Sequence, residues 1–176
     1  YYELTNYVPI FSTDYTMTVQ YDGTTYTAAS TMNPPVALDT VGYEFFEGFF
    51  GLGPGYFAKL RFYDPPGIGN RYIVALSMNH VEATNLTDLF LQDDDYSDGN
   101  LVERPLFSDS LFQIGDTIGL EMRSVDKAVY DYFSEILSIA GGQSSAAPAN
   151  PKTNWNNKAL GYFSAYSNSR AEVVIQ

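Results

Sequence analysis

Short stretches of alternating apolar and polar residues run through most of the chain, and this period of two is typical of half-buried β-strands. Residues 15–21 (YTMTVQY) alternate strictly, and residues 24–28 continue the pattern after Asp22-Gly23. Asp-Gly readily supplies the positive φ values of a tight turn, so this stretch predicts a β-hairpin. The hairpin is expected to end at Pro34-Pro35, because a central strand cannot contain proline.

Similar patterns predict strands along the rest of the chain. The expected strands are residues 41–50, 56–63, 71–77, 101–107, 117–123, 159–166 and 171–175. Residues 167–170 are expected to form the turn between the last two strands. Pro105 places its strand at a sheet edge, because proline has no N–H to donate to a neighbouring strand. A short helical turn is expected near Asp88.

One segment, residues 124–140, has the period of an α-helix instead. Its apolar residues recur every three or four positions on one face: Val125, Val129, Tyr132, Phe133, Ile136, Leu137 and Ala140. Ser124 or Asp126 is expected to cap the first turn, and Gly141 and Gly142 to end the helix with positive φ. A lone helix of this length is marginal in water, so its apolar face must pack on a sheet.

These elements predict a mainly β protein, an antiparallel β-sandwich with one amphipathic helix packed on it. Pro34-Pro35 marks the expected domain boundary. Residues 1–33 are too few for a sandwich and are interpreted as the last strands of an Ig-like domain whose earlier strands are missing. Residues 34–176 are expected to form the second, β-rich domain. Its long loop, residues 143–158, is expected to be pinned to the body by Trp155, the only Trp.

Composition supports this fold and narrows the classes of function. Aromatic residues make up 16% of the chain, which favours strands, and we prefer core packing to a sugar-binding platform as their role. The net charge of −12 argues against nucleic acid as a partner. With no Cys, disulfides and thiolate chemistry are excluded. The chain shows no membrane-spanning run and no signal peptide, and because Tyr1 is not Met, we expect a processed product or part of a longer chain.

The densest group of possible metal ligands is residues 93–100 (DDDYSDGN). Asp94, Asp98 and Gly99 match part of a calcium-loop pattern, in which a compact loop supplies several oxygen ligands. Tyr96 and Pro105 occupy the third and twelfth positions, where such a loop has ligands. A solvated acidic turn is therefore the preferred interpretation of Asp93–Asp98, with a calcium site as the alternative.

Other catalytic patterns are lacking. His80 is the only His, and its neighbours Asn79 and Glu82 indicate a surface turn rather than a metal site or triad. There is no G-x-S-x-G motif and no P-loop. No catalytic, cofactor-binding or metal-binding residue is assigned, and the chain is predicted not to be an enzyme.

Several stretches, taken in their order, resemble the Bacteroidetes outer-membrane lipoprotein family catalogued as domain of unknown function 4249. They are residues 15–32, 34–35, 64–67, 88–95, 98–99, 112–117, 124–136, 149–151 and 159–166. The resemblance implies a lipoprotein with an N-terminal Ig-like domain and a second β-rich domain, at the outer membrane and on the cell surface. It also implies a protein partner, a TonB-dependent transporter or a larger outer-membrane complex.

A lipid anchor would have to precede Tyr1, because the sequence lacks the family's lipobox Cys, and we expect membrane contact only through that anchor. The family carries no established ligand residues to transfer, and no cofactor is expected. The alternative function is an extracellular glycan- or peptide-binding module that uses aromatic residues around 43–50, Tyr56 and Trp155. In either case the binding surface is expected on loops rather than on the helix.

Overall fold

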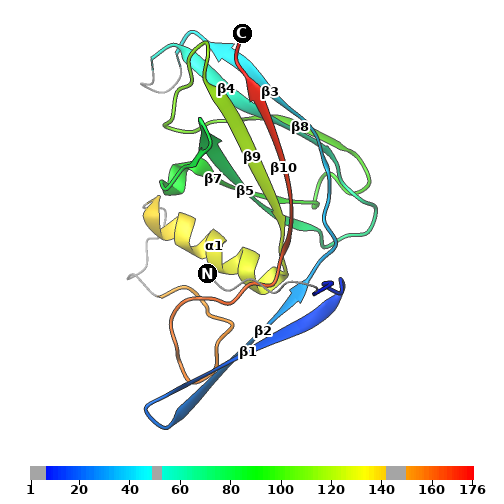
Figure 1. Cartoon of the computed structure of the whole chain (residues 1–176), viewed down its shortest axis with the longest axis vertical. Helices are drawn as coiled ribbons and strands as arrows, with labels where there is room; N and C mark the ends of the chain where they lie inside the picture. Colours follow the sequence, from blue (N-terminus) through cyan, green and yellow to red (C-terminus); the bar gives the residue numbers. More distant parts are fainter. Residues whose placement is uncertain (1–6, 49–52, 142–149) are drawn as a thin grey trace.

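The protein is mainly β in the computed structural model, which describes residues 7–48, 53–141 and 150–176 (Figure 1). The strands are β1 (Thr13–Tyr21), β2 (Thr24–Met32), β3 (Leu38–Phe46), β4 (Gly55–Tyr63), β5 (Arg71–Met78), β6 (Val81–Glu82), β7 (Leu89–Asp93), β8 (Leu101–Leu106), β9 (Thr117–Ser124) and β10 (Ser167–Val174). The helix α1 spans Lys127–Ala140, and a single 3-10 turn, η1, spans Leu86–Asp88. The predicted mainly β class, with antiparallel sheets and one helix, is confirmed.

Two antiparallel sheets pack face to face around the main core. The larger sheet has the order β10-β9-β5-β6, with β7 also pairing with β5, and the smaller sheet has the order β3-β4-β8. One cluster of buried side chains joins them, with Leu60 and Phe62 from the smaller sheet and Val74 and Leu120 from the larger. The sandwich therefore holds together by burial of apolar side chains between its sheets.

Strand β4 shows how the alternation in the sequence builds this arrangement. Leu60 and Phe62 are completely buried, whereas Arg61 between them points outward and pairs with Asp39 at 2.7 Å and with Glu103 at 2.8 Å. Successive side chains of a strand point to opposite faces, so one sequence supplies both the core and a charged outer surface. Strand β8 pairs only with β4 among the described strands, which confirms the edge position expected from Pro105.

Helix α1 covers one end of the larger sheet's outer face (Figure 1). Val129 is buried against Ile73 and Val125, with Leu91 and Phe133 partly buried beside them. The side chain of Asp126 accepts from Val129 N, so Asp126 is the cap. The alternative cap, Ser124, is wrong, because it is the last residue of β9.

The expected end of the helix is wrong at Gly141, which has a φ of −74°. Its N–H instead bonds to the carbonyls of Leu137 and Ile139, which needs no left-handed residue. Gly142, the other residue predicted to end the helix, lies outside the described residues, as do residues 143–149 of the predicted loop.

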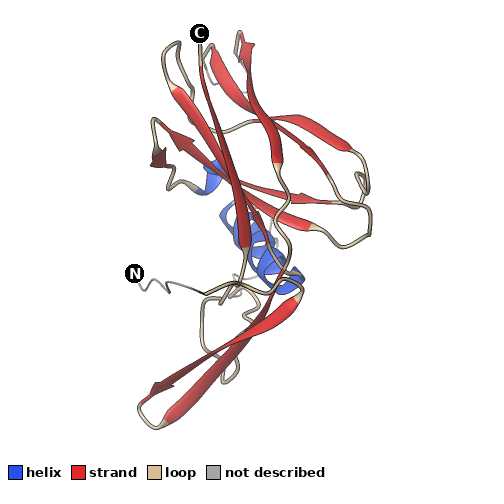
Figure 2. Cartoon of the chain, turned by 45° about the vertical axis from the view of Figure 1, so that its right-hand side comes forward, coloured by secondary structure: helices blue, strands red, loops and turns tan. Residues whose placement is uncertain are grey.

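Strands β1 and β2 form a two-stranded sheet of their own that projects from the sandwich (Figure 2). Asp22 and Gly23 have φ values of 46° and 71°, which confirms the predicted hairpin turn. Asn33 Nδ2 donates to the carbonyl of Val125 at 2.7 Å and so ties the end of the hairpin to the start of the helix. The assignment of residues 1–33 to an Ig-like domain stays a prediction.

The strand predicted at 171–175 is confirmed as part of β10, whereas the strand predicted at 159–166 and the turn predicted at 167–170 are wrong. A single strand, β10, pairs with β9 from Ser167 onward and includes the residues expected to form a turn. Before it, the Asn154 side chain donates to the carbonyl of Phe163 and accepts from its N–H. Ala165 N donates to Ser30 Oγ. Side chains thus satisfy backbone groups that a neighbouring strand would otherwise bind.

Two further expectations differ in detail. The strand predicted at 41–50 is β3, which ends at Phe46; residues 49–52 lie outside the described part of the chain. Trp155 forms a bridge with Ala28, so it fastens its loop to the hairpin rather than to the sandwich. Asn156 strengthens this attachment, because its N–H donates to Thr27 O at 3.0 Å and its side chain accepts from Thr27 N at 2.8 Å.

Candidate functional site

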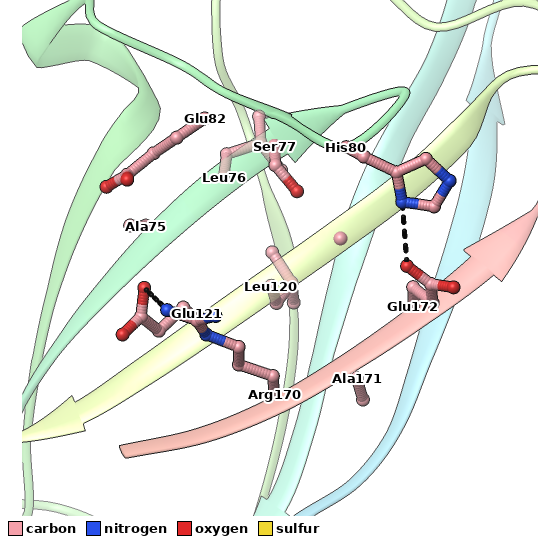
Figure 3. A pocket seen from close by; sticks show the side chains of 11 residues that line it. Ala75, Leu76, Ser77, His80, Glu82, Leu120, Glu121, Arg170, Ala171 and Glu172 are labelled. Carbon is pink, nitrogen blue, oxygen red and sulfur yellow. Dashed lines mark ion pairs between the residues drawn. The ribbon is translucent and has the colours of Figure 1, made fainter. Parts of the chain in front are cut away.

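A groove of about 450 Å³ lies on the outer face of the larger sheet, beyond the end that α1 covers (Figure 3). Its floor is made of small residues, Ala75 and Ser77 from β5 and Gly119 from β9. These side chains alternate with the buried Leu76 and Leu120, which point into the core. A Cβ at residue 119 would overlap Ser77 Oγ, so the close approach of β9 to Ser77 requires glycine at this position.

Glu121 is the centre of the charged network beside this floor. Its carboxylate accepts from Arg123 at 2.9 Å and from Asn168 at 2.5 Å, and it pairs with Arg170 at 3.2 Å. Burial alone raises the pKa of Glu121, but the hydrogen bonds and positive charges of these partners outweigh burial and lower it to about 2. Glu121 therefore remains ionised in the folded protein at ordinary pH.

Arg123 links this carboxylate to the β6 side of the groove. It also binds Glu82 at 2.8 Å, and its guanidinium lies over the Tyr166 ring at 5.4 Å from the centroid. Burial lowers the pKa of Arg123, but Glu121 and Glu82 raise it above its ordinary value overall. Most charges around Glu121 are thus satisfied within the chain and hold a fixed geometry.

His80 lies at the other end of the groove. It follows Asn79 in the β5–β6 turn, where both residues have positive φ, and the predicted surface turn is confirmed. Its Nδ1 lies 3.2 Å from Glu172 Oε2 on β10, a partner 92 positions away that no local pattern could identify (Figure 3). Ser77 lines the same groove, but no hydrogen bond joins it to His80 among the described residues. Among the described residues, Ser77 and His80 therefore do not form the nucleophile–base contact of a catalytic triad.

The acidic turn after β7 is not solvated as a whole, so the preferred interpretation of this segment is wrong in part. Asp94 is fully buried, with a relative exposure of 0%, whereas Tyr96 and Asp98 are exposed. Asp93 accepts a hydrogen bond from Tyr130 at 3.0 Å, so this carboxylate faces the helix. The turn therefore divides its carboxylates between a buried side and a solvent side.

Asp94 and Asp98 are joined by a third carboxylate, Asp64, which follows β4. One oxygen from each residue lies within 4.8 Å of the other two. Asp64 is 2% exposed, and burial raises its pKa above the ordinary value, with a further contribution from the charge of Asp94; the hydrogen bond from Tyr72 acts in the opposite direction. Sequence reasoning missed Asp64 because it lies 30 positions before Asp94 and carries no local motif.

The aromatic residues suggested for sugar stacking do not share one surface in the described structure. Tyr43 and Tyr56 pack edge to face at 5.6 Å and lie against the main core. Trp155 belongs to the loop on the hairpin, at the opposite end of the molecule (Figure 1). Phe49 and Phe50 fall outside the described residues.

The hairpin presents an incompletely covered apolar face. Met17, Val19 and Tyr21 alternate along β1 and are 44%, 38% and 74% exposed. The intervening Thr18 lies on the opposite, polar face. In the described part of the chain, β1 pairs only with β2, so its other edge has no strand partner.

No helix among the described residues is both long and apolar enough to cross a membrane. A family model described as "Domain of unknown function (DUF4249)" matches residues 1–172. Neither the curated proteins nor the solved structures give a match. The matched region includes the hairpin, the sandwich and the helix, and the chain therefore belongs to the DUF4249 family.

Proposed function

We propose that this protein is a non-enzymatic accessory subunit at the outer membrane, lipid-anchored at the cell surface, that binds a TonB-dependent transporter or a larger outer-membrane complex. The hairpin is the proposed docking element. The observation that carries this proposal is the apolar face of β1, with Met17, Val19 and Tyr21 left exposed on a strand that projects from the body.

The physical support is that a partner covering the apolar face of this hairpin would stabilise it. Full burial of an apolar side chain of this size contributes roughly 1.5–3 kcal/mol. A two-stranded hairpin is marginal in isolation, and here the hydrogen bonds from the loop at Asn154–Asn157 reach β2, with none to β1 among the described residues. The free edge of β1 also offers N–H and C=O groups to a strand of a partner. A protein partner that adds a strand and an apolar surface would satisfy both needs.

The lipid anchor is supported by the resemblance of this chain to outer-membrane lipoproteins. It is tested on the natural full-length protein by metabolic labelling with a fatty-acid analogue. Labelled protein in the outer-membrane fraction is expected. Absence of the label from that protein would overturn the anchored part of the proposal while leaving the hairpin contact to be tested separately.

The docking element is tested by photo-crosslinking in native outer membranes. A photoreactive amino acid at Val19 is expected to crosslink to a large β-barrel protein that mass spectrometry then identifies. The matched control places the same amino acid at Thr18, one residue away on the polar face, where little crosslinking is expected. Recovery of free monomer only from both positions, or equal crosslinking from both, would contradict the proposal.

The groove on the larger sheet favours a second candidate function, binding of a charged peptide. Its lining residues include no Phe, Tyr or Trp, which argues against a glycan, whereas Glu82, Arg170 and Glu172 offer charges of both signs. Calorimetry with short charged peptides is expected to give binding that Arg170→Glu weakens at least tenfold. If no peptide binds at millimolar concentration, this candidate function is excluded.

A further inference from the structure

We propose that Asp64, Asp94 and Asp98 bind one calcium ion, which fastens together two loops that cross between the sheets. This inference is independent of the hairpin and of any partner. It starts from the three carboxylates whose oxygens lie within 4.8 Å of one another, two of them buried and one exposed.

The position of the cluster in the fold explains why a cation would matter there. Residues 64–70 connect β4 of the smaller sheet to β5 of the larger one, and residues 94–100 connect β7 of the larger sheet back to β8 of the smaller one. The two loops run side by side, because Asp64 N donates to the carbonyl of Asn100 at 2.9 Å. One ion bound by both loops would hold the two sheets together at this end.

Each carboxylate is held in place through one of its oxygens. Asp94 Oδ2 accepts from the backbone N–H groups of Gly69 at 2.7 Å and Asn70 at 2.8 Å. Asp98 Oδ1 accepts from the N–H of Gly67 at 2.6 Å. Asp64 Oδ1 accepts from the Tyr72 hydroxyl at 2.6 Å. Three carboxylates from two loops are thus oriented before any ligand arrives, which lowers the entropic cost of binding.

The second oxygen of each buried carboxylate has no partner. Asp64 Oδ2 and Asp94 Oδ1 are both inaccessible to solvent and make no hydrogen bond of ordinary geometry, although Asn70 and Gly99 lie close enough to Asp64 to lower its pKa in part. Among the described residues, no Lys, Arg or His forms an ion pair with Asp64, Asp94 or Asp98. Burial of a carboxylate oxygen without a hydrogen-bond donor is unfavourable. Here two such oxygens lie near a third carboxylate, and no positive charge of the described residues balances the three negative charges. A bound cation supplies that charge.

The ligand chemistry selects a hard divalent cation. All three ligands are carboxylate oxygens, with neither nitrogen nor sulfur in the cluster. Calcium binds oxygen at 2.3–2.6 Å, so two of its ligands can be as far apart as about 5 Å, whereas magnesium at 2.0–2.1 Å allows only about 4 Å. Separations within 4.8 Å are compatible with calcium, which also tolerates irregular geometry, whereas magnesium demands a near-ideal octahedron. Water on the exposed side of Asp98 would complete the coordination.

The binding test uses the full chain, treated with a chelator and dialysed. Titration with calcium chloride is expected to show one bound ion per chain by calorimetry. Extracellular calcium modules often have dissociation constants of about 10⁻⁴–10⁻³ M. At roughly ten times such a value the melting temperature is expected to rise by about 3–6 °C. Magnesium at the same concentration is expected to give less than half of that rise.

Asp98→Asn is the decisive variant, because Asp98 is exposed and its replacement should leave the fold intact. It is expected to weaken calcium binding at least tenfold. Asp95→Asn is the matched control, since it removes an exposed charge from the same turn but not from the cluster, and it is expected to bind as the wild type does. The proposal fails if the wild type shows neither heat nor a thermal shift at 5 mM calcium, or if Asp98→Asn binds like Asp95→Asn.

A proton held by Asp64, whose pKa burial raises, is the competing explanation of the unpaired oxygens. In that case calcium would not bind, and Asp64→Asn would raise the melting temperature of the chelator-treated protein without any response to calcium. This result would overturn the metal site. A calcium-dependent rise in the wild type that Asp64→Asn abolishes would support it.

Discussion

The Asp126 carboxylate joins the hairpin to the helix, because it accepts a hydrogen bond from Ser30 Oγ at 2.5 Å while it caps α1. One oxygen binds the helix and the other binds the hairpin. Oδ1 accepts from Val129 N at 2.9 Å, and Oδ2 accepts from Ser30 Oγ and from Thr31 N at 3.0 Å. One side chain therefore fixes both the first turn of the helix and the direction in which the hairpin leaves the sandwich.

Asp126→Ala is expected to destabilise the protein by about 2–3 kcal/mol. Loss of an N-cap costs typically about 1 kcal/mol, and donors from the hairpin would lose their acceptor as well. Urea denaturation gives the free energy of unfolding. Asp131→Ala is the control, since Asp131 belongs to the same helix and, in the described part of the chain, pairs only with the exposed Lys127. Equal losses in both variants would show that the link to Ser30 contributes nothing.

The hairpin turn and the alternation of β4 could be predicted because both depend on residues close in sequence. Asp22 and Gly23 favour the positive φ values of the turn by themselves. In β4, the apolar–charged–apolar order of Leu60, Arg61 and Phe62 indicates directly which side chains are buried. The helix was also recognisable, although Asp126 could not be distinguished from Ser124 as its cap without knowing where β9 ends.

The errors come from long-range contacts that no local pattern contains. Residues 159–166 alternate as a strand would, but Asn154 and Ser30 bind their backbone instead of a neighbouring strand. The polar composition of the acidic turn predicts a solvated segment, but Asp94 is buried and accepts hydrogen bonds from Gly69 and Asn70, which belong to a loop distant in sequence. Sequence reasoning found two of the three carboxylates of the candidate cation site, and the fold supplied the third, Asp64.

The apolar face of α1 is less uniformly buried than its period implies, and this changes the expected effect of substitutions. Val129 is 1% exposed, whereas Phe133 is only partly buried and contacts Tyr162 at 4.9 Å between ring centroids. We expect Val129→Asp to unfold the protein and Phe133→Asp to destabilise it by roughly 2–4 kcal/mol. The introduced carboxylate would lose all of its contact with water at residue 129 but only part of it at residue 133, so the cost in folding free energy is larger at residue 129. Thermal melts followed by circular dichroism measure both.

Ile139→Asp serves as the control for this pair, since Ile139 is on the same helix and 38% exposed. It is expected to change stability by less than 1 kcal/mol. A Phe133→Asp variant that melts as the wild type does would contradict the packing of α1 on the larger sheet.

Because the pKa of Glu121 is lowered in the folded protein, the free energy of unfolding is expected to decrease at low pH. In the folded state the pKa is about 2, against 4.5 for an ordinary Glu, so the unfolded chain binds a proton more readily between these values. The stabilisation is complete above pH 4.5 and is lost as the pH falls toward 2. The total loss is at most about 3 kcal/mol.

Urea denaturation between pH 5 and pH 2.5 tests this dependence. Glu121→Gln is expected to flatten that part of the stability profile, because it removes the titrating group. Glu172→Gln alters an exposed carboxylate of the same groove and is expected to leave the slope unchanged. If both variants keep the slope of the wild type, another group is responsible for the acid sensitivity.

Gly119 is expected to be required only as long as Ser77 carries a hydroxyl. A Cβ at residue 119 overlaps Ser77 Oγ but stays 3.7 Å from Ser77 Cβ, which is an ordinary contact. Gly119→Ala alone should therefore cost about 1–2 kcal/mol through overpacking, whereas Gly119→Ala combined with Ser77→Ala should recover most of that loss. A double-mutant cycle measured by urea denaturation gives the coupling directly. Additive effects of the two substitutions would mean that the strand conformation, rather than contact with Ser77, demands glycine in the floor of the groove.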